Sequence, residues 1–88
     1  MKNIINDKLI QPFEIHVDSE NFVVGIPHVT KEGKAVLTGS KFYTSLPRAL
    51  EYIVKSNMAN EGGEFTIKEY ITEFINRLQN IKQTIKLY

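Results

Sequence analysis

Three side chains of the acid or imidazole type alternate along one short segment and could bind a metal ion. Glu14, His16 and Asp18 are spaced two residues apart, so in a strand they point the same way. In an extended strand, however, their Cβ atoms spread over about 13 Å, so the two ends cannot reach one ion unless the strand bends. We therefore interpret them as a solvated strand face and expect no metal.

Two other segments contain fragments of catalytic motifs. Residues 38–41 resemble part of a phosphate-binding loop, but the full motif and the helix that should follow it are missing. Thr30 lies close to His28, but no orienting carboxylate or oxyanion hole accompanies them. The chain has no cysteine, which excludes thiolate nucleophiles, Cys-based metal sites and disulfides. The sequence predicts no enzyme, no catalytic residue and no cofactor.

The charge balance disfavours nucleic acid as a partner. Eleven basic and ten acidic residues give a formal charge of +1, so long-range attraction to phosphates should be weak. A local cluster of basic residues that could contact phosphates is formed by Lys31, Lys34 and Lys41 near Tyr43, although Glu32 lies between the first two lysines. Nucleic-acid binding through this hairpin is kept as an alternative function.

Size and composition predict one small folded domain, residues 1–88. The hydrophobic fraction of 42% and the charged fraction of 24% are typical of globular chains. We expect a cytoplasmic protein, because there is no cysteine and no apolar run long enough for a signal peptide or a membrane span. A chain of 88 residues buries a modest core, and oligomerisation is a common remedy at this size.

The first half of the chain has the period of strands. We expect a flexible polar lead-in over residues 1–8 and a three-stranded antiparallel sheet over residues 9–43. A two-residue loop at Ser19 and Glu20 would join the first two strands. The pairs would then be Val17 with Phe22, Ile15 with Val24, and Phe13 with Ile26.

The third strand has two possible registers. A three-residue turn over 31–33, with Gly33 left-handed, places Phe42 opposite Phe22 and Val36 opposite His28. A two-residue turn would flip the strand. Both faces of this strand carry apolar residues, so the pattern does not decide between the turns.

The second half has the period of helices. Ser45 can cap a helix over residues 45–58, and Thr66 with Glu69 forms a capping box that opens a helix over residues 66–87. The predicted fold class is therefore α+β: a three-stranded antiparallel β-meander followed by two α-helices.

The second helix carries a heptad-like apolar seam. Its residues follow one another at intervals of 4, 3, 4, 3 and 4: Ile67, Ile71, Phe74, Leu78, Ile81 and Ile85. The seam either packs on the sheet of its own chain or is shared with a second copy or another protein. The second alternative predicts a homodimer, with self-association through Phe74, Leu78, Ile81 and Ile85.

One face of the sheet is a second candidate surface. Gly25 and Gly39 are predicted to be cross-strand neighbours surrounded by apolar side chains, where bare backbone permits close approach. The face is either an open contact surface or covered by a helix. If it is open, the candidate partner-binding residues are Val23, Leu37, Lys41 and Tyr43.

The strand-to-helix junction carries the one family resemblance in the chain. The aromatic–Thr–Ser–Leu step within residues 42–50 resembles small phage- and prophage-encoded accessory proteins of Gram-positive bacteria, with a loose similarity over residues 13–78. The resemblance implies expression in the host cytoplasm and an accessory or host-defence-inhibiting role, and it transfers no catalytic residue. The expected function is non-enzymatic binding that occludes a protein partner. The alternatives are a nucleic-acid-binding regulator and a small ligand-sequestering protein.

Overall fold

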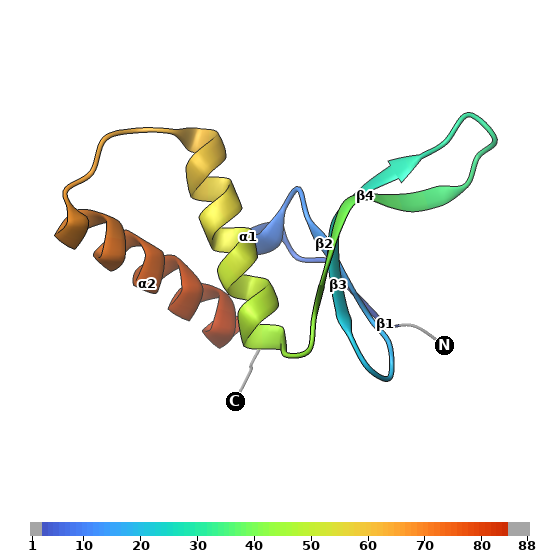
Figure 1. The fold of residues 1–88 in the computed structure, drawn as a ribbon, viewed down its shortest axis with the longest axis horizontal. Coiled ribbons are helices and arrows are strands. Elements are labelled where there is room, and N and C mark those ends of the chain that lie inside the picture. The colour runs from blue at the N-terminus through green and yellow to red at the C-terminus, as the bar shows by residue number, and fades with distance from the viewer. Residues whose placement is uncertain (1–2, 85–88) are drawn as a thin grey trace. The chain divides into compact units, whose positions relative to one another are not determined.

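The computed structural model describes residues 3–84, and the chain divides into two compact units, Met1–Ala49 and Leu50–Tyr88. The first unit contains a four-stranded antiparallel sheet in the order β1-β2-β3-β4, and the helices follow it in the chain (Figure 1). The α+β class is confirmed, but the sheet has four strands, not the predicted three. The elements are β1 (Asn3–Ile5), a 3₁₀ turn (Lys8–Ile10), β2 (Glu14–Val17), β3 (Phe22–Val29), β4 (Ala35–Tyr43), α1 (Leu46–Glu61) and α2 (Ile67–Thr84).

The additional strand, β1, lies in the segment predicted to be a flexible lead-in. It pairs antiparallel with β2, with Ile4 opposite His16 and Ile5 opposite Ile15. Two adjacent isoleucines have high β propensity, but three residues are too few to show a period of two. The following turn is capped by Asp7, whose carboxylate accepts a hydrogen bond of 2.9 Å from the backbone N–H of Leu9.

The hairpin between β2 and β3 has the predicted register, with Val17 opposite Phe22 and Ile15 opposite Val24. The carboxylate of Asp18 accepts hydrogen bonds from two backbone N–H groups in the loop, which holds the tight turn.

The predicted pair of Phe13 with Ile26 is wrong, because the ladder between β2 and β3 ends at Glu14 and Gly25. The backbone N–H of Phe13 instead donates to the carbonyl oxygen of Ile10 at 2.8 Å. The 3₁₀ turn therefore takes up the backbone N–H of Phe13, which a longer β2 would need for pairing.

The hairpin between β3 and β4 has the three-residue turn. Gly33 has a φ of 82°, and the backbone N–H of Thr30 donates to the carbonyl of Lys34 at 2.8 Å. The predicted pairing of His28 with Val36 follows from this turn and is confirmed.

A β-bulge changes the register farther along β4. Val24 pairs with Lys41 and Ile26 with Thr38, so β4 uses three steps where β3 uses two, and Gly39 within the bulge has a φ of 64°. As a result Phe42 lies opposite Val23, and its predicted pairing with Phe22 is wrong.

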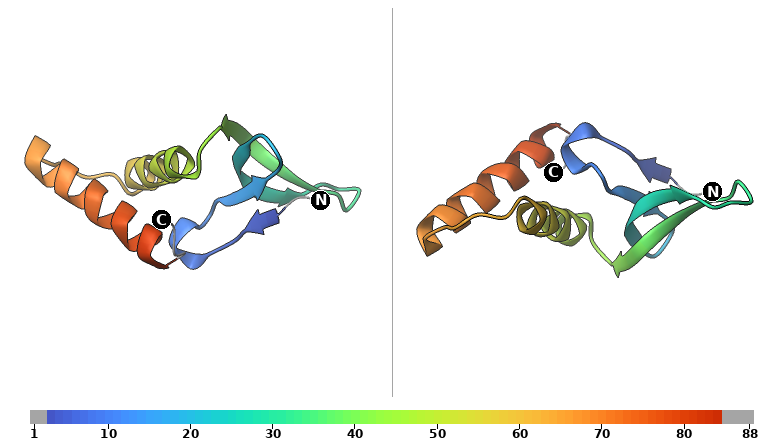
Figure 2. Two further views of the ribbon diagram at one scale, coloured as in Figure 1. Left: turned by 90° about the horizontal axis from the view of Figure 1, so that it is seen from below. Right: turned by 90° about the horizontal axis from the view of Figure 1, so that it is seen from above.

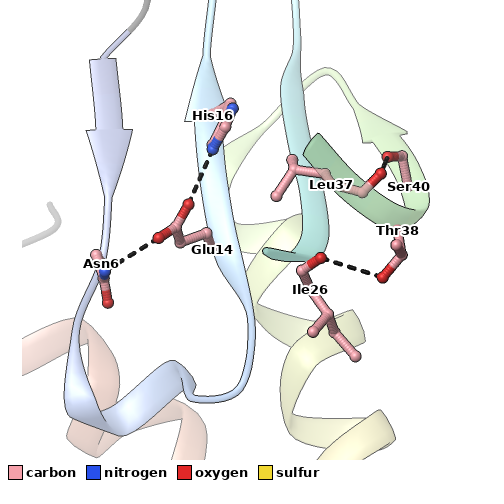
Figure 3. A network of polar contacts seen from close by, with 7 residues as sticks. All are labelled: Asn6, Glu14, His16, Ile26, Leu37, Thr38 and Ser40. Carbon is pink, nitrogen blue, oxygen red and sulfur yellow. Dashed lines mark hydrogen bonds and ion pairs between the residues drawn. The ribbon is translucent and has the colours of Figure 1, made fainter. Parts of the chain in front are cut away.

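Side-chain hydroxyls accompany the bulge. Thr38 Oγ1 donates to the carbonyl of Ile26 at 3.1 Å, and Ser40 Oγ donates to the carbonyl of Leu37 at 3.4 Å (Figure 3). These contacts satisfy acceptors where the regular ladder is interrupted.

The two helices begin close to their predicted starts. The backbone N–H of Arg48 donates to the hydroxyl of Ser45 at 3.4 Å. The first helix extends to Glu61, beyond the predicted end at residue 58, because the residue that ends it is Gly62, which adopts the left-handed conformation with a φ of 73°. The second helix is described as far as Thr84, and the rest of the predicted helix lies outside the described residues.

The capping box at the start of α2 is confirmed. The Thr66 hydroxyl accepts from the backbone N–H of Glu69 at 3.1 Å, and the Glu69 carboxylate accepts from the backbone N–H of Thr66 at 2.9 Å. The hydrogen bond from the backbone N–H of Thr66 to this carboxylate is the main cause that holds the pKa of Glu69 below its usual value of 4.5. Within residues 3–84, no helix has the length and apolar character needed to cross a membrane.

Candidate interaction surfaces

Where β2 pairs with β3, the sheet has one buried face and one more open face. Ile15 and Val24 are paired across β2 and β3 and are fully buried, which defines the covered face. Side chains alternate along each strand, so the residues next to Ile15 and Val24 in the sequence point to the opposite face, which we call the open face.

A single cross-strand row crosses the open face from β1 to β4. Its members are paired in succession: Ile4 with His16, His16 with Val23, and Val23 with Phe42. Ile4 is 58% exposed and Phe42 is 66% exposed, although both are large apolar residues in a regular sheet.

The apolar surface continues along the hairpin of β3 and β4. A Cβ added to Gly25 would lie 2.8 Å from the Cβ of Leu37, so Leu37 occupies the same face as Gly25. Pro27 pairs with Leu37 and Val29 pairs with Ala35, and both strands are exposed toward the turn. The hairpin projects beyond β1 and β2 (Figure 1).

A polar cluster interrupts the row at its centre. His16 Nε2 lies 3.0 Å from Glu14 Oε1, and the amide of Asn6 donates to Glu14 Oε2 at 3.0 Å (Figure 3). Both members of the His–Glu pair are about four-fifths buried. Among residues 3–84, no group of three His, Cys, Asp or Glu side chains is placed to hold a metal ion. The cluster can therefore offer directed hydrogen bonds within an apolar surface.

The bulge divides the predicted partner-binding residues between the two faces. Val23 and Leu37 lie on the open face, whereas Lys41 pairs with Val24 and Tyr43 pairs with Phe22 on the opposite face. Gly25 does not leave bare backbone open for a partner, because Leu37 of the same chain packs against it.

Sequence reasoning missed Ile4 and Phe42 as surface residues. Ile4 lay in the segment interpreted as a lead-in. Phe42 was placed on the opposite face, since one extra residue in β4 reverses the direction of every later side chain. The glycine in the middle of a strand pattern, Gly39, was the available signal of a bulge.

The second unit contains a helical hairpin that opens toward its loop. The ends of α1 and α2 that the loop over residues 62–66 joins lie well apart (Figures 1 and 2). A groove of about 530 Å³ is lined by residues of both helices and the loop. Its lining is largely apolar and comes from both helices and the loop: Lys55, Met58, Ala59, Gly62, Gly63, Phe65, Thr66, Ile67, Tyr70 and Ile71.

Three isoleucines on α2 remain exposed at or beside this groove. Ile67 is 82% exposed, Ile71 50% and Ile75 45%, and they follow one another at intervals of four residues. Residues four apart lie on the same side of a helix, so they form one continuous strip, which we call the isoleucine stripe.

The predicted self-association residues lie mainly on the buried part of the same helix. Leu78 and Ile81 are buried within the single chain, and Phe74 is half-buried. Ile85 lies outside the described residues. The apolar seam is therefore covered at the end of α2 and uncovered at its start.

Arg77 connects the two helices of the hairpin. Its guanidinium makes two hydrogen bonds with the carboxylate of Glu61, at 2.8 and 2.7 Å, and one of 2.6 Å with Glu73. The hydrogen bond from Arg77 is the main cause that holds the pKa of Glu61 below its usual value, and the two carboxylates raise the pKa of Arg77. This fork bridges the last residue of α1 and the middle of α2.

Comparisons with protein-family models, with curated proteins and with solved structures find no match to this chain.

Proposed function

We propose that this chain is a small protein-binding module that acts by covering the surface of a protein partner with the open face of its sheet. The observation that carries the proposal is the row from Ile4 to Phe42, in which the two outer positions are more than half exposed. Large exposed apolar side chains that share a surface with polar groups are typical of protein interaction sites.

The composition of the face suits a binding surface. Phe42 provides an aromatic side chain, and burying an aromatic side chain dominates the energetics of many interfaces. The surrounding aliphatic residues can exclude water from such a contact. The cluster of His16, Glu14 and Asn6 adds polar groups that favour a partner with matching donors and acceptors.

The projecting hairpin adds reach to this surface. Near Val29 and Ala35, β3 and β4 pair with each other and with no other strand that the structure describes. An isolated two-stranded ribbon is marginally stable in water, so contact with a partner would stabilise it. The more specific role, inhibition of a host defence or regulatory protein by a phage product, has its support in the resemblance of the strand-to-helix junction.

The proposal is tested by photo-crosslinking from the surface itself. The chain is expressed in the organism that encodes it, with p-benzoylphenylalanine at position 42 in place of Phe42. We expect one dominant adduct with another protein, which mass spectrometry identifies, and a purified partner that binds the unmodified chain.

The matched control places the same probe at Glu20, which is exposed at the loop between β2 and β3. This position should give little or none of the same adduct. Substitution of Phe42 by Ser should weaken binding of the purified partner by at least tenfold while the circular dichroism spectrum is unchanged. Equal crosslinking from positions 42 and 20, or unchanged affinity of the Phe42→Ser variant, would contradict the proposal.

A further inference from the structure

The isoleucine stripe of α2 has the same spacing on both sides of Ile71, so two copies of it match each other in an antiparallel arrangement. We propose that a second copy of this chain binds the stripe with its own stripe, antiparallel, with Ile71 of each copy next to the two-fold axis. This inference concerns the second unit and does not depend on the sheet-face partner.

The geometry of the stripe is self-complementary. In an antiparallel pair centred on Ile71, Ile67 of one copy lies at the height of Ile75 of the partner subunit, and the reverse contact follows by symmetry. Residues at intervals of four form a ridge on the helix surface, and two such ridges pack at a crossing angle of about −50°. Every exposed isoleucine of the stripe thus gains an apolar neighbour.

The charges of α2 permit this contact. Glu69 and Glu73 are each two residues from Ile71, and residues two apart do not share a helix face. Both carboxylates also have partners within the chain, because Glu69 closes the capping box and Glu73 pairs with Arg77. Neither of these two carboxylates therefore has to be desolvated when the stripes meet.

The residues beside the stripe are also suitable. Lys68 follows Ile67 on one flank, and at the antiparallel register it lies near the height of Thr72 of the partner subunit, whose hydroxyl can accept a hydrogen bond. The other flank carries Tyr70 and Phe74, whose rings are stacked with centroids 6.4 Å apart.

The exposed area is sufficient for the centre of an interface. The stripe, together with the partly exposed rings of Phe65 and Tyr70, presents roughly 500 Å² of surface, against the ~800 Å² per partner of a standard interface. Polar residues of the rim supply the remainder in such interfaces. The heptad spacing of the helix, which continues from the buried residues Leu78 and Ile81 into the stripe, favours another helix as the occupant.

The first test is the mass of the full chain in solution. Sedimentation equilibrium should give twice the chain mass of 10.1 kDa at tens of micromolar, and Ile71→Glu should give a monomer, because two carboxylates would meet at the axis. Ile71 is half exposed, so the variant should keep its helical circular dichroism signal. The matched control, Asn76→Glu, changes an exposed polar position of the same helix and should remain dimeric.

The second test measures the register with cysteine pairs, which the cysteine-free chain allows. Ile71→Cys alone should form a disulfide-linked dimer under mild oxidation. Ile67→Cys alone should not, since its two copies are about 12 Å apart along the helices, too far for a disulfide. A mixture of Ile67→Cys and Ile75→Cys should give the mixed dimer.

A wild-type chain that stays monomeric at several hundred micromolar would overturn the inference. So would a dimer that Ile71→Glu leaves intact, or crosslinking from Ile67→Cys that equals that of Ile71→Cys. If the chain is monomeric but Ile71→Glu abolishes binding of a different protein, the occupant is that protein and the second-copy inference fails, whereas the sheet-face proposal is tested separately by Phe42.

Discussion

At the scale of single residues, Gly25 shows how a motif that suggests function can have a structural cause. Its backbone lies opposite the bulge of β4, where a Cβ atom would approach the Cβ of Leu37 to 2.8 Å and the carbonyl oxygen of Thr38 to 3.1 Å. The approach to Leu37 is closer than real Cβ contacts come, and the approach to Thr38 is tighter than most of them. The glycine is therefore required by the packing of two strands of the same sheet.

We expect Gly25→Ala to destabilise the chain by about 1–3 kcal/mol, the usual cost of overpacking a filled site. Urea denaturation followed by circular dichroism measures the change in the free energy of unfolding. Combining Gly25→Ala with Leu37→Gly removes the closest atom, so the double variant should be less destabilised than the sum of the two single variants. Additive effects would show that the contact does not limit this position.

At the scale of elements, the features that depend on neighbouring residues could be predicted, and those that depend on pairing with distant residues could not. The turn at Ser19 and Glu20 and the capping box of α2 follow from residues within four positions of each other, whereas the pattern left two turns possible over residues 31–33. The bulge at Gly39 and the strand Asn3–Ile5 exist because of cross-strand pairing. Since the bulge reverses one half of β4, the predicted site was divided between two faces.

The same distinction applies to the helical elements. The heptad spacing of α2 correctly indicated a continuous apolar surface. It could not show that Leu78 and Ile81 are buried while Ile67 and Ile71 are exposed, because that depends on how α1 and α2 diverge. The angle of a helix pair is a tertiary property that sequence periodicity along one helix does not contain.

The bridge between the helical elements gives a pH prediction. The pKa of Glu61 is lower in the folded chain than its usual value of 4.5, chiefly through the hydrogen bond from Arg77. A carboxyl whose folded pKa is depressed stabilises the fold above its unfolded pKa, and this contribution is lost as the pH falls through the folded pKa.

We therefore expect the melting temperature of the wild type to exceed that of Glu61→Gln at pH 7, and the difference to shrink as the pH falls below about 4.5. Thermal melts in buffers from pH 7 to pH 3 measure this difference. The effect should be small and should decrease with salt, since the pair is exposed to solvent. The control, Glu64→Gln in the exposed loop, should show no such trend. A difference that is constant over the whole pH range would argue against a role for the ion pair.

At the scale of the whole molecule, the two proposed surfaces have separate consequences because they lie on different units of the chain. A dimer formed through α2 carries two copies of the sheet face, so a partner with repeated binding sites would be held more tightly than by either face alone. Ile71→Glu should remove that gain, whereas Phe42→Ser should weaken the binding of each single face.

The whole-molecule charge bears on the alternative in which the hairpin of β3 and β4 binds nucleic acid. The net charge is +1, and at the tip Glu32 lies between Lys31 and Lys34. Because phosphate contacts by lysine and arginine provide nearly all non-specific affinity for nucleic acid, we expect no measurable binding to a random duplex. Fluorescence anisotropy of a labelled duplex at 50 mM salt measures this, with chain concentrations up to about 100 μM, the weak end of non-specific affinities. Binding that weakens steeply with salt and that is lost in a Lys31→Gln, Lys34→Gln double variant would instead make the hairpin a nucleic-acid contact, and the sheet face would need a different explanation.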